Sequence, residues 1–174
     1  MNTDRRDDEF REYVLHRRPA LVRTATLLAA GDRHSAEDLA QIALTKLYVA
    51  WPRVRPMTRD AYLHRTLVHA VIDDSRRRKR RPESLTDALP DHPAPAEPEI
   101  ADQQIRDALA ALPTRMRAAV VLVHWMDLDA DAAAAALGCR PGTVKSQASR
   151  GIAKLRDLLA TTDGPHYFVA GGNR

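Results

Sequence analysis

The feature that most limits how this chain can fold is residues 82–100, which hold five prolines and five acidic residues but no Lys or Arg. This composition favours an extended, solvated connection over a packed core. We therefore expect domains at 7–81 and 101–160, an acidic linker at 82–100 and a tail at 161–174. A surface loop inside one domain is the less favoured alternative, because structureless loops of this length are uncommon.

The composition predicts an all-α fold of two small helical domains. The chain has 174 residues with only 7 glycines, and Ala, Leu and Arg are abundant. Its single cysteine, Cys139, has no intramolecular partner. No stretch approaches the roughly 20 apolar residues of a membrane span, and the N-terminus lacks the apolar segment of a signal peptide. No membrane insertion and a cytoplasmic location are expected.

Three helices are expected in the first domain. The first covers 7–30, with a kink or a division into two helices at Pro19, where a backbone donor is lost. The second opens with the capping-box pattern Ser35-Ala-Glu-Asp38 and stops at Trp51. Leu39, Ile42, Ala43, Leu47 and Ala50 are predicted to lie on one side of this helix. The third starts near Asp60 and runs into six consecutive basic residues at 76–81.

The second domain is expected to contain helices at about 101–111, 114–126, 130–137 and 141–159. The last two are joined by a short turn at Gly138, which is the layout of a helix-turn-helix. The final helix is predicted to bury Val144, Ala148, Ile152 and Leu155. These residues have helical spacing.

Burying that side leaves a polar surface suited to DNA on the final helix. Gln and Arg can read base edges, Ser and Thr can bond bases or phosphates, and Lys neutralises phosphate. The surface comprises Thr143, Lys145, Ser146, Gln147, Ser149, Arg150 and Lys154. The basic run at 76–81 continues a helix and is suited to phosphate contact. Ordinary solvated helix faces are the alternative for both segments.

Two separated groups of motifs resemble the group IV, or extracytoplasmic-function, sigma factors, and the resemblance covers roughly residues 7–159. The first group is Ala36-Glu-Asp-Leu-Ala-Gln41 through Trp51, followed by Leu67-Val-His-Ala-Val-Ile-Asp-Asp-Ser-Arg-Arg77. The second is Leu109-Ala-Ala-Leu-Pro-Thr-Arg-Met-Arg117, then Leu137-Gly-Cys-Arg-Pro-Gly-Thr-Val-Lys-Ser146 and Arg150. The actinobacterial sigma-E-like branch is one candidate within the group.

The resemblance implies a sigma factor that directs core RNA polymerase to specific promoters and initiates transcription. Docking on the beta-prime clamp of the polymerase would use Glu37, Asp38, Leu39, Gln41, Leu44 and Leu47. A flipped minus-ten base would be captured beside the loop at 52–58. Minus-ten DNA would contact Arg53, Arg55, His69, Asp73, Arg76, Arg77, Arg78, Lys79, Arg80 and Arg81.

The resemblance also implies contacts to promoter DNA upstream of the minus-ten element, and a regulatory protein partner. Minus-thirty-five DNA would contact Arg140, Thr143, Lys145, Ser146, Gln147, Ser149, Arg150 and Lys154. Promoter DNA and core polymerase are the expected partners, and the habit of the family suggests an inhibitory anti-sigma factor. The chain departs from the family pattern at Ile42, where an acid is frequent, at His69, where asparagine is frequent, and near Ala132, where a glutamate is common.

The remaining candidate residues favour structural roles. None of the seven histidines has metal-ligand spacing with a supporting acid or cysteine, so we expect no metal site. Cys139, Trp51, His124 and Trp125 are predicted to pack inside or between helices. No phosphate loop, nucleophile elbow or paired carboxylate is present, which predicts no cofactor and no enzyme. A stand-alone helix-turn-helix regulator and a polymerase-binding protein without promoter contact are the alternative functions.

Overall fold

The structure is a computed structural model that describes residues 3–80 and 99–160. Arg81, the tail at 161–174 and the linker up to residue 98 lie outside the described residues. The described ranges are built from helices without a strand, which confirms the all-α prediction. The ends of the predicted helices agree with the observed ends to within a few residues, except at the start of the chain.

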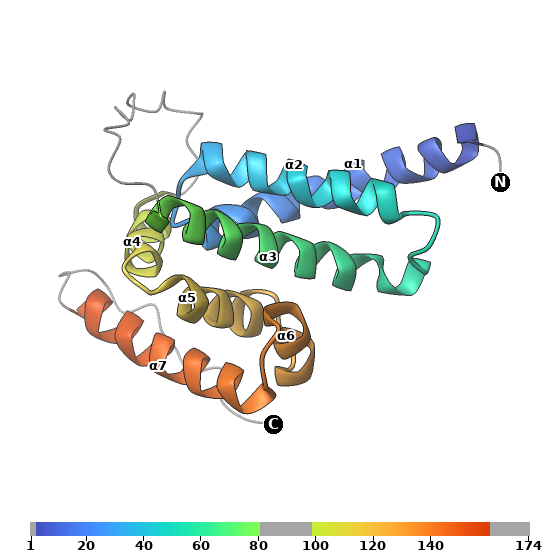
Figure 1. Cartoon of the computed structure of the whole chain (residues 1–174). Helices are drawn as coiled ribbons and strands as arrows, with labels where there is room; N and C mark the ends of the chain where they lie inside the picture. Colours follow the sequence, from blue (N-terminus) through green and yellow to red (C-terminus); the bar gives the residue numbers. More distant parts are fainter. Residues whose placement is uncertain (1–2, 81–98, 161–174) are drawn as a thin grey trace.

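The first domain is a bundle in which α1 (Thr3–Leu28) and α3 (Arg59–Arg80) both pack on α2 (Arg33–Ala50), as Figure 1 shows. A short 3-10 turn, η1 (Pro56–Thr58), precedes α3. Large side chains fill the core, among them Leu28, Leu47, Trp51, Leu63 and Leu67. The rings of Phe10 and Tyr13 meet the Trp51 ring edge-on, with centroids 5.1 and 5.2 Å away.

Helix α1 continues through Pro19, so the predicted division into two helices is wrong. Proline at this position leaves the carbonyl of Leu15 without its helical partner. Residues 15–20 are all exposed, so water can bond that carbonyl. The free-energy cost of the proline is therefore low here. Helix α1 packs through half-buried Phe10, Tyr13 and Val14 before Pro19 and through buried Leu21, Ala25 and Leu28 after it.

Helix α2 is capped by Asp32, not by the predicted Ser35 pattern. The Asp32 carboxylate accepts hydrogen bonds from the backbone N–H of Ser35, at 3.0 Å, and from the Ser35 hydroxyl. Arg78, near the end of α3, lies 3.6 Å from the same carboxylate and donates to the Ser35 hydroxyl. Partial burial acts to raise the pKa of Asp32, but the bonds from Ser35 and the charge of Arg78 outweigh it and lower that pKa.

The second domain contains α4 (Glu99–Ala110), α5 (Thr114–Val120), α6 (Ala130–Leu137) and α7 (Pro141–Ala160). Asp129 caps α6, and Gly138 in the left-handed conformation, at φ 63°, makes the turn into α7. Helices α5 and α7 approach closely at Gly151, where an added Cβ would lie 2.4 Å from a methyl carbon of Val120. The predicted helix-turn-helix is present.

A π-helical turn, η2 (Val121–Trp125), follows α5 and exposes two residues that were predicted to pack inside. The backbone N–H groups of Met126 and Leu128 bond to carbonyls five and six residues earlier, and Asp127 adopts φ 52°. Because this turn holds more residues than an α-helical turn, the side chains that follow it point in other directions than a regular helix would give them. His124 is exposed and Trp125 is 56% exposed, so the packing prediction is wrong for both.

The two domains touch along α3, a contact that no pattern in the sequence indicates. Val68, Ile72 and Ser75 lie on one side of α3 at helical spacing, away from the side that faces α2. Val68 and Ile72 are buried, and the Ser75 hydroxyl lies 2.8 Å from the Thr114 hydroxyl at the start of α5. Helix α6 packs on α3 in the same region (Figure 1).

Candidate nucleic-acid interface

The free surface of α7 is one broad face with a different stripe of residues along each edge. Val144, Ala148 and Leu155 are buried, while Ile152 is half-buried. The helical repeat then sets Thr143, Gln147, Arg150 and Lys154 on one stripe and Lys145, Ser149, Ile152 and Arg156 on another. The structure thus separates two of the residues predicted for minus-thirty-five contact, Lys145 and Ser149, from the others. Counting the helical repeat along the sequence could have shown this division.

The first stripe is polar and open. Arg150, Thr143 and Lys154 are exposed, whereas Gln147 and the neighbouring Ser146 are half-buried. The Ser146 hydroxyl donates to the carbonyl of Thr143 at 3.0 Å. No ion pair involves Arg150 or Lys154 in the part of the chain that the structure describes. Their charges are therefore available to an anionic partner such as DNA.

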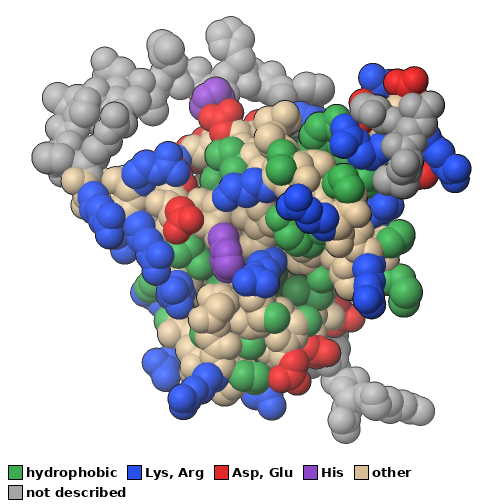
Figure 2. Space-filling model, turned by 45° about the vertical axis from the view of Figure 1, so that its right-hand side comes forward, with side chains coloured by type: hydrophobic (Ala, Val, Ile, Leu, Met, Phe, Trp, Pro, Cys, Tyr) green, Lys and Arg blue, Asp and Glu red, His purple; other side chains and the backbone are tan. Residues whose placement is uncertain are grey.

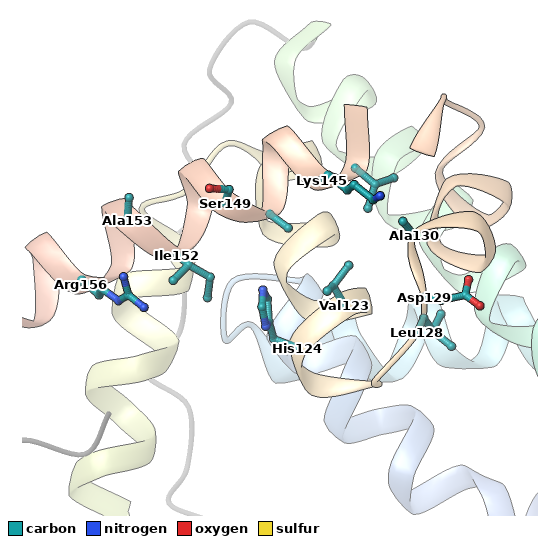
Figure 3. A pocket seen from close by; sticks show the side chains of 12 residues that line it. Val123, His124, Leu128, Asp129, Ala130, Lys145, Ser149, Ile152, Ala153 and Arg156 are labelled. Carbon is teal, nitrogen blue, oxygen red and sulfur yellow. The ribbon is translucent and has the colours of Figure 1, made fainter. Parts of the chain in front are cut away.

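The second stripe borders a groove of about 530 Å³ between α7 and the segment from η2 to the start of α6. Figure 3 shows Ile152 and His124 on facing walls of this groove. Apolar groups from Val123, Leu128, Val144 and Ala148 form its floor, with charged residues at the rim.

Helix α3 has a free stripe at helical spacing that is distinct from its two buried sides. It comprises Tyr62, His69, Asp73, Arg76 and Arg80, of which Tyr62 and His69 are half-buried. Three predicted minus-ten residues, His69, Asp73 and Arg76, therefore share one face. The loop that carries Arg53 and Arg55 lies at the opposite end of α3 from the basic run, and the helical rise puts His69 about 15 Å along the axis from Arg59.

Members of the basic run differ in their surroundings. Arg77, Lys79 and Arg80 are exposed, and Arg76 forms an exposed ion pair with Asp73 at 3.6 Å. Arg78 is bound into the fold, because it also pairs with Asp74 at 2.8 Å in addition to its contacts at the start of α2. The sequence pattern alone treats all six residues as equivalent, and only the tertiary contact with Asp32 sets Arg78 apart.

The residues predicted for polymerase docking divide between surface and core. Leu39, Leu44 and Leu47 are buried, whereas Asp38 and Gln41 are exposed. Glu37 is half-buried and its carboxylate accepts from Arg18 at 2.6 Å.

The exposed stripe of α2 instead contains Asp38, Ile42, Thr45 and Val49, at helical spacing. Ile42 is 40% exposed and Val49 is 72% exposed, so Ile42 does not share the buried side of Leu39, Ala43 and Leu47 as predicted. These two exposed aliphatic residues lie two turns apart on one face of α2, where they can contribute to a protein contact.

The electrostatic character of the whole molecule agrees with an anionic partner. The chain carries 27 Lys and Arg against 23 Asp and Glu. Figure 2 shows Lys and Arg side chains spread over one face, with hydrophobic side chains exposed between them. Among the described residues, no group of three or more His, Cys, Asp and Glu is placed to hold a metal ion. The described helices include none with the length and apolar character to cross a membrane.

Two small helical domains, the second ending in a helix-turn-helix with a free cationic stripe, define a transcription protein that binds DNA. The chain matches the family models described as Sigma-70 region 2, over residues 13–81, and Sigma-70, region 4, over residues 102–155. It is 39% identical to RNA polymerase sigma-E factor of Streptomyces coelicolor, over 89% of this chain and 88% of that protein.

Two further similarities cover almost the whole chain. ECF RNA polymerase sigma factor EcfG of Rhodopseudomonas palustris is 30% identical over 95% of this chain and 97% of that protein. A solved structure of the sigma factor RpoE in complex with the anti-sigma factor NepR, from Bartonella quintana, is similar with a TM-score of 0.70 and 28% identity. That match covers 90% of this chain and 99% of the other. The chain belongs to the extracytoplasmic-function sigma factors of the sigma-70 family.

Proposed function

We propose that this sigma factor guides core RNA polymerase to promoters through three free stripes on three different helices. The observation that carries the proposal is that α2, α3 and α7 each keep a polar or cationic stripe outside the two cores. Domains at 7–81 and 101–160, joined by a linker at 82–100, would let one chain read two separated promoter elements. The tail at 161–174 has no assigned role.

The stripe on α2 is proposed to bind the polymerase clamp. Asp38, Gln41 and Glu37 would supply polar contacts, and Ile42 with Val49 would supply apolar area. Leu39, Leu44 and Leu47 would hold the helix in place from the core side, since their side chains are buried. This assignment extends the residues expected from the sequence by two exposed aliphatic residues.

The stripe on α3 is proposed to bind minus-ten DNA. His69 and Asp73 would face a captured, unpaired base, and Arg76, Arg77, Lys79 and Arg80 would track the phosphates nearby. Arg53 and Arg55 would meet the strand at the other end of the helix. Arg78 would keep the helix in position through its ion pair with Asp32, which caps α2, and Arg81, outside the described residues, completes the proposed set.

The stripe on α7 is proposed to enter the major groove at the minus-thirty-five element. Thr143, Gln147 and Arg150 are the candidates for base contact, with Ser146 beside them. Arg140 and Lys154 would contact phosphates. Lys145 and Ser149 belong to the groove side, and we propose that they reach only the edge of the DNA.

The protein is further proposed to be cytoplasmic, to use no metal or cofactor and to catalyse no reaction of its own, as fits an initiation factor. An anti-sigma partner is proposed because a protein of the same fold, RpoE of Bartonella quintana, is seen in complex with the anti-sigma factor NepR.

Run-off transcription with purified core polymerase and a genomic fragment library tests the proposed function. The expected result is a set of start sites that share sequences about ten and thirty-five bases upstream. Binding to DNA without any effect of core polymerase would favour a stand-alone regulator. Binding to core polymerase without transcription starts would favour an interaction protein.

Replacing one arginine on each stripe of α7 tests which stripe reads DNA. We expect Arg150→Ala to weaken promoter binding by about 1–3 kcal/mol, because a bidentate contact to guanine is of that size. Arg156→Ala, on the groove side of the same helix, is the matched control and should leave the promoter preference unchanged. Equal losses in both variants would contradict the assignment of the stripes.

A further inference from the structure

The groove of about 530 Å³ beside α7 has an apolar interior and a charged rim. Val144 and Ala148 are buried at its floor, and half-buried Ile152 forms a wall opposite His124 (Figure 3). Arg156 stands at the rim. Such a groove favours an occupant with a few adjacent apolar side chains, because these leave water when they enter it.

The groove follows α7 from Lys145 to Arg156. The helical rise makes this distance about 17 Å. Helix α7 ends at Ala160, one turn beyond Arg156. One end of the groove therefore lies close to the place where the chain leaves α7.

The tail at 161–174 continues from that place and lies outside the described residues. Its large apolar side chains, Tyr167, Phe168 and Val169, are adjacent and fall in a run without glycine or proline, 166–170. Gly164-Pro165 before this run is a sequence pattern typical of turns. In extended form the run 166–170 would span about 17 Å, which is the length of the groove.

The charges at the near end of the groove also suit the tail. Asp163 is the only acidic residue of the tail and comes directly before Gly164-Pro165. Arg156 is exposed and forms no ion pair within the residues that the structure describes. A pair between Asp163 and Arg156 would hold the chain where it must reverse direction. Because exposed ion pairs contribute little free energy, the apolar side chains would supply most of the affinity.

We propose that the groove is the docking site of the protein's own tail. The tail would turn back at Gly164-Pro165 and run antiparallel to α7, with the apolar side chains of Tyr167, Phe168 and Val169 in the groove. The stripe with Thr143, Gln147 and Arg150 lies along the other edge of α7 and would stay free. A protein partner that uses the groove would have to displace the tail. This inference gives the tail a role that the proposed function does not, and it does not depend on promoter binding.

Photo-crosslinking within the full chain tests the inference. Replacing Tyr167 with p-benzoylphenylalanine keeps an aromatic side chain and adds a group that crosslinks on irradiation. We expect a product of monomer size in which peptide mapping joins residue 167 to groove residues such as Ile152 and His124. The same replacement at Asn173, beyond Gly171-Gly172, is the control and should give no product that maps to the groove.

Variants of the groove make the test specific. Ile152→Ser removes an apolar wall and should lower the yield of the groove product by about twofold or more. Ala153→Lys, at an exposed position on the same groove, should give a similar loss without a change in the core. Lys154→Ala, exposed on the other stripe of α7, is the matched control and should keep the full yield. Circular dichroism and thermal unfolding check that each variant is folded.

Three outcomes would overturn the inference. A crosslinked product of dimer size would assign the groove to a second copy of the chain. A product that maps away from the groove would place the tail elsewhere, and the absence of any product from residue 167 would leave the groove to an outside partner. Run-off transcription reports on the proposed function separately, so none of these outcomes would be mistaken for its failure.

Discussion

The two domains build their cores from different proportions of large and small side chains. The first fills its interior with large side chains, including Trp51, Leu47 and Leu67, and with the rings of Phe10 and Tyr13 around Trp51. The second relies on small residues that let helices approach closely. These are Ala118, Ala119, Ala133, Ala134, Ala136, Ala148 and Gly151. The stability of the first core depends on the apolar area that its large side chains bury. The stability of the second depends more on small side chains, because these leave room for helices to pack closely.

The two tryptophans give the largest expected difference between the domains. Trp51→Ala should lower the free energy of unfolding by about 3–5 kcal/mol, because it removes the centre of the aromatic cluster. Trp125→Ala should change it by only about 0.5 kcal/mol or less, since Trp125 is 56% exposed on the second domain. Urea unfolding followed by circular dichroism measures both. Similar losses in the two variants would mean that the aromatic cluster does not dominate the first core.

Adding a single carbon to the second domain should have the next largest effect. Gly151→Ala brings a Cβ into the side chains of Val120 and Met116, and we expect a loss of about 1–3 kcal/mol despite the better helix propensity of alanine. The matched control is Gly142→Ala on the same helix, where nothing lies within 4 Å of the added carbon. That variant should be neutral or more stable by up to about 1 kcal/mol. Thermal unfolding distinguishes the two, and a stable Gly151→Ala protein would contradict the close packing of α5 and α7.

Removal of the two aspartate caps should give the smallest difference in stability between the domains. This difference should depend on pH. Asp32→Ala removes a cap and an ion pair in the first domain and should cost about 1 kcal/mol at pH 7. Asp129→Ala removes only a cap in the second domain, so we expect a somewhat smaller loss. The folded-state pKa of Asp32 is lowered from 3.8, so its contribution is present above that pH and is lost as the pH falls through the lowered pKa.

Stability measured at pH 7 and between pH 4 and pH 2 checks this prediction. The gap between the native protein and Asp32→Ala should shrink over the acid range. A gap that stays constant down to pH 2 would show that the charge of Asp32 does not contribute.

Periodicity and turn chemistry were sufficient to predict the helices and the helix-turn-helix. Gly138 and Pro141 mark the turn and the start of α7, and the observed helices follow these local signals. The continuous α1 was missed because the tolerance of Pro19 depends on the exposure of its surroundings, which is a tertiary property. The Asp32 cap was missed because Ser35, three residues later, matches a capping pattern equally well.

The candidate site was predicted only in part. Residue types pointed to helices that keep exposed polar residues, but Leu39, Leu44 and Leu47 are in the core and Trp125 is at the surface. A helical-wheel count would have found the leucines, whereas the π-helical turn that exposes Trp125 has no such signal. The separate role of Arg78 and the contact between Ser75 and Thr114 depend on residues distant in sequence, which local patterns cannot predict.

The two stripes and the buried side of α7 share no residue, and this separation bears on how the protein can evolve. Gly151 fixes the recognition helix by close backbone approach, while Thr143, Gln147 and Arg150 take no part in the core. On the proposed DNA contact, substitutions at these three positions would change the sequence that is read with little loss of stability to be compensated elsewhere. Lineages descended from this scaffold would then exchange one target sequence for another by single steps.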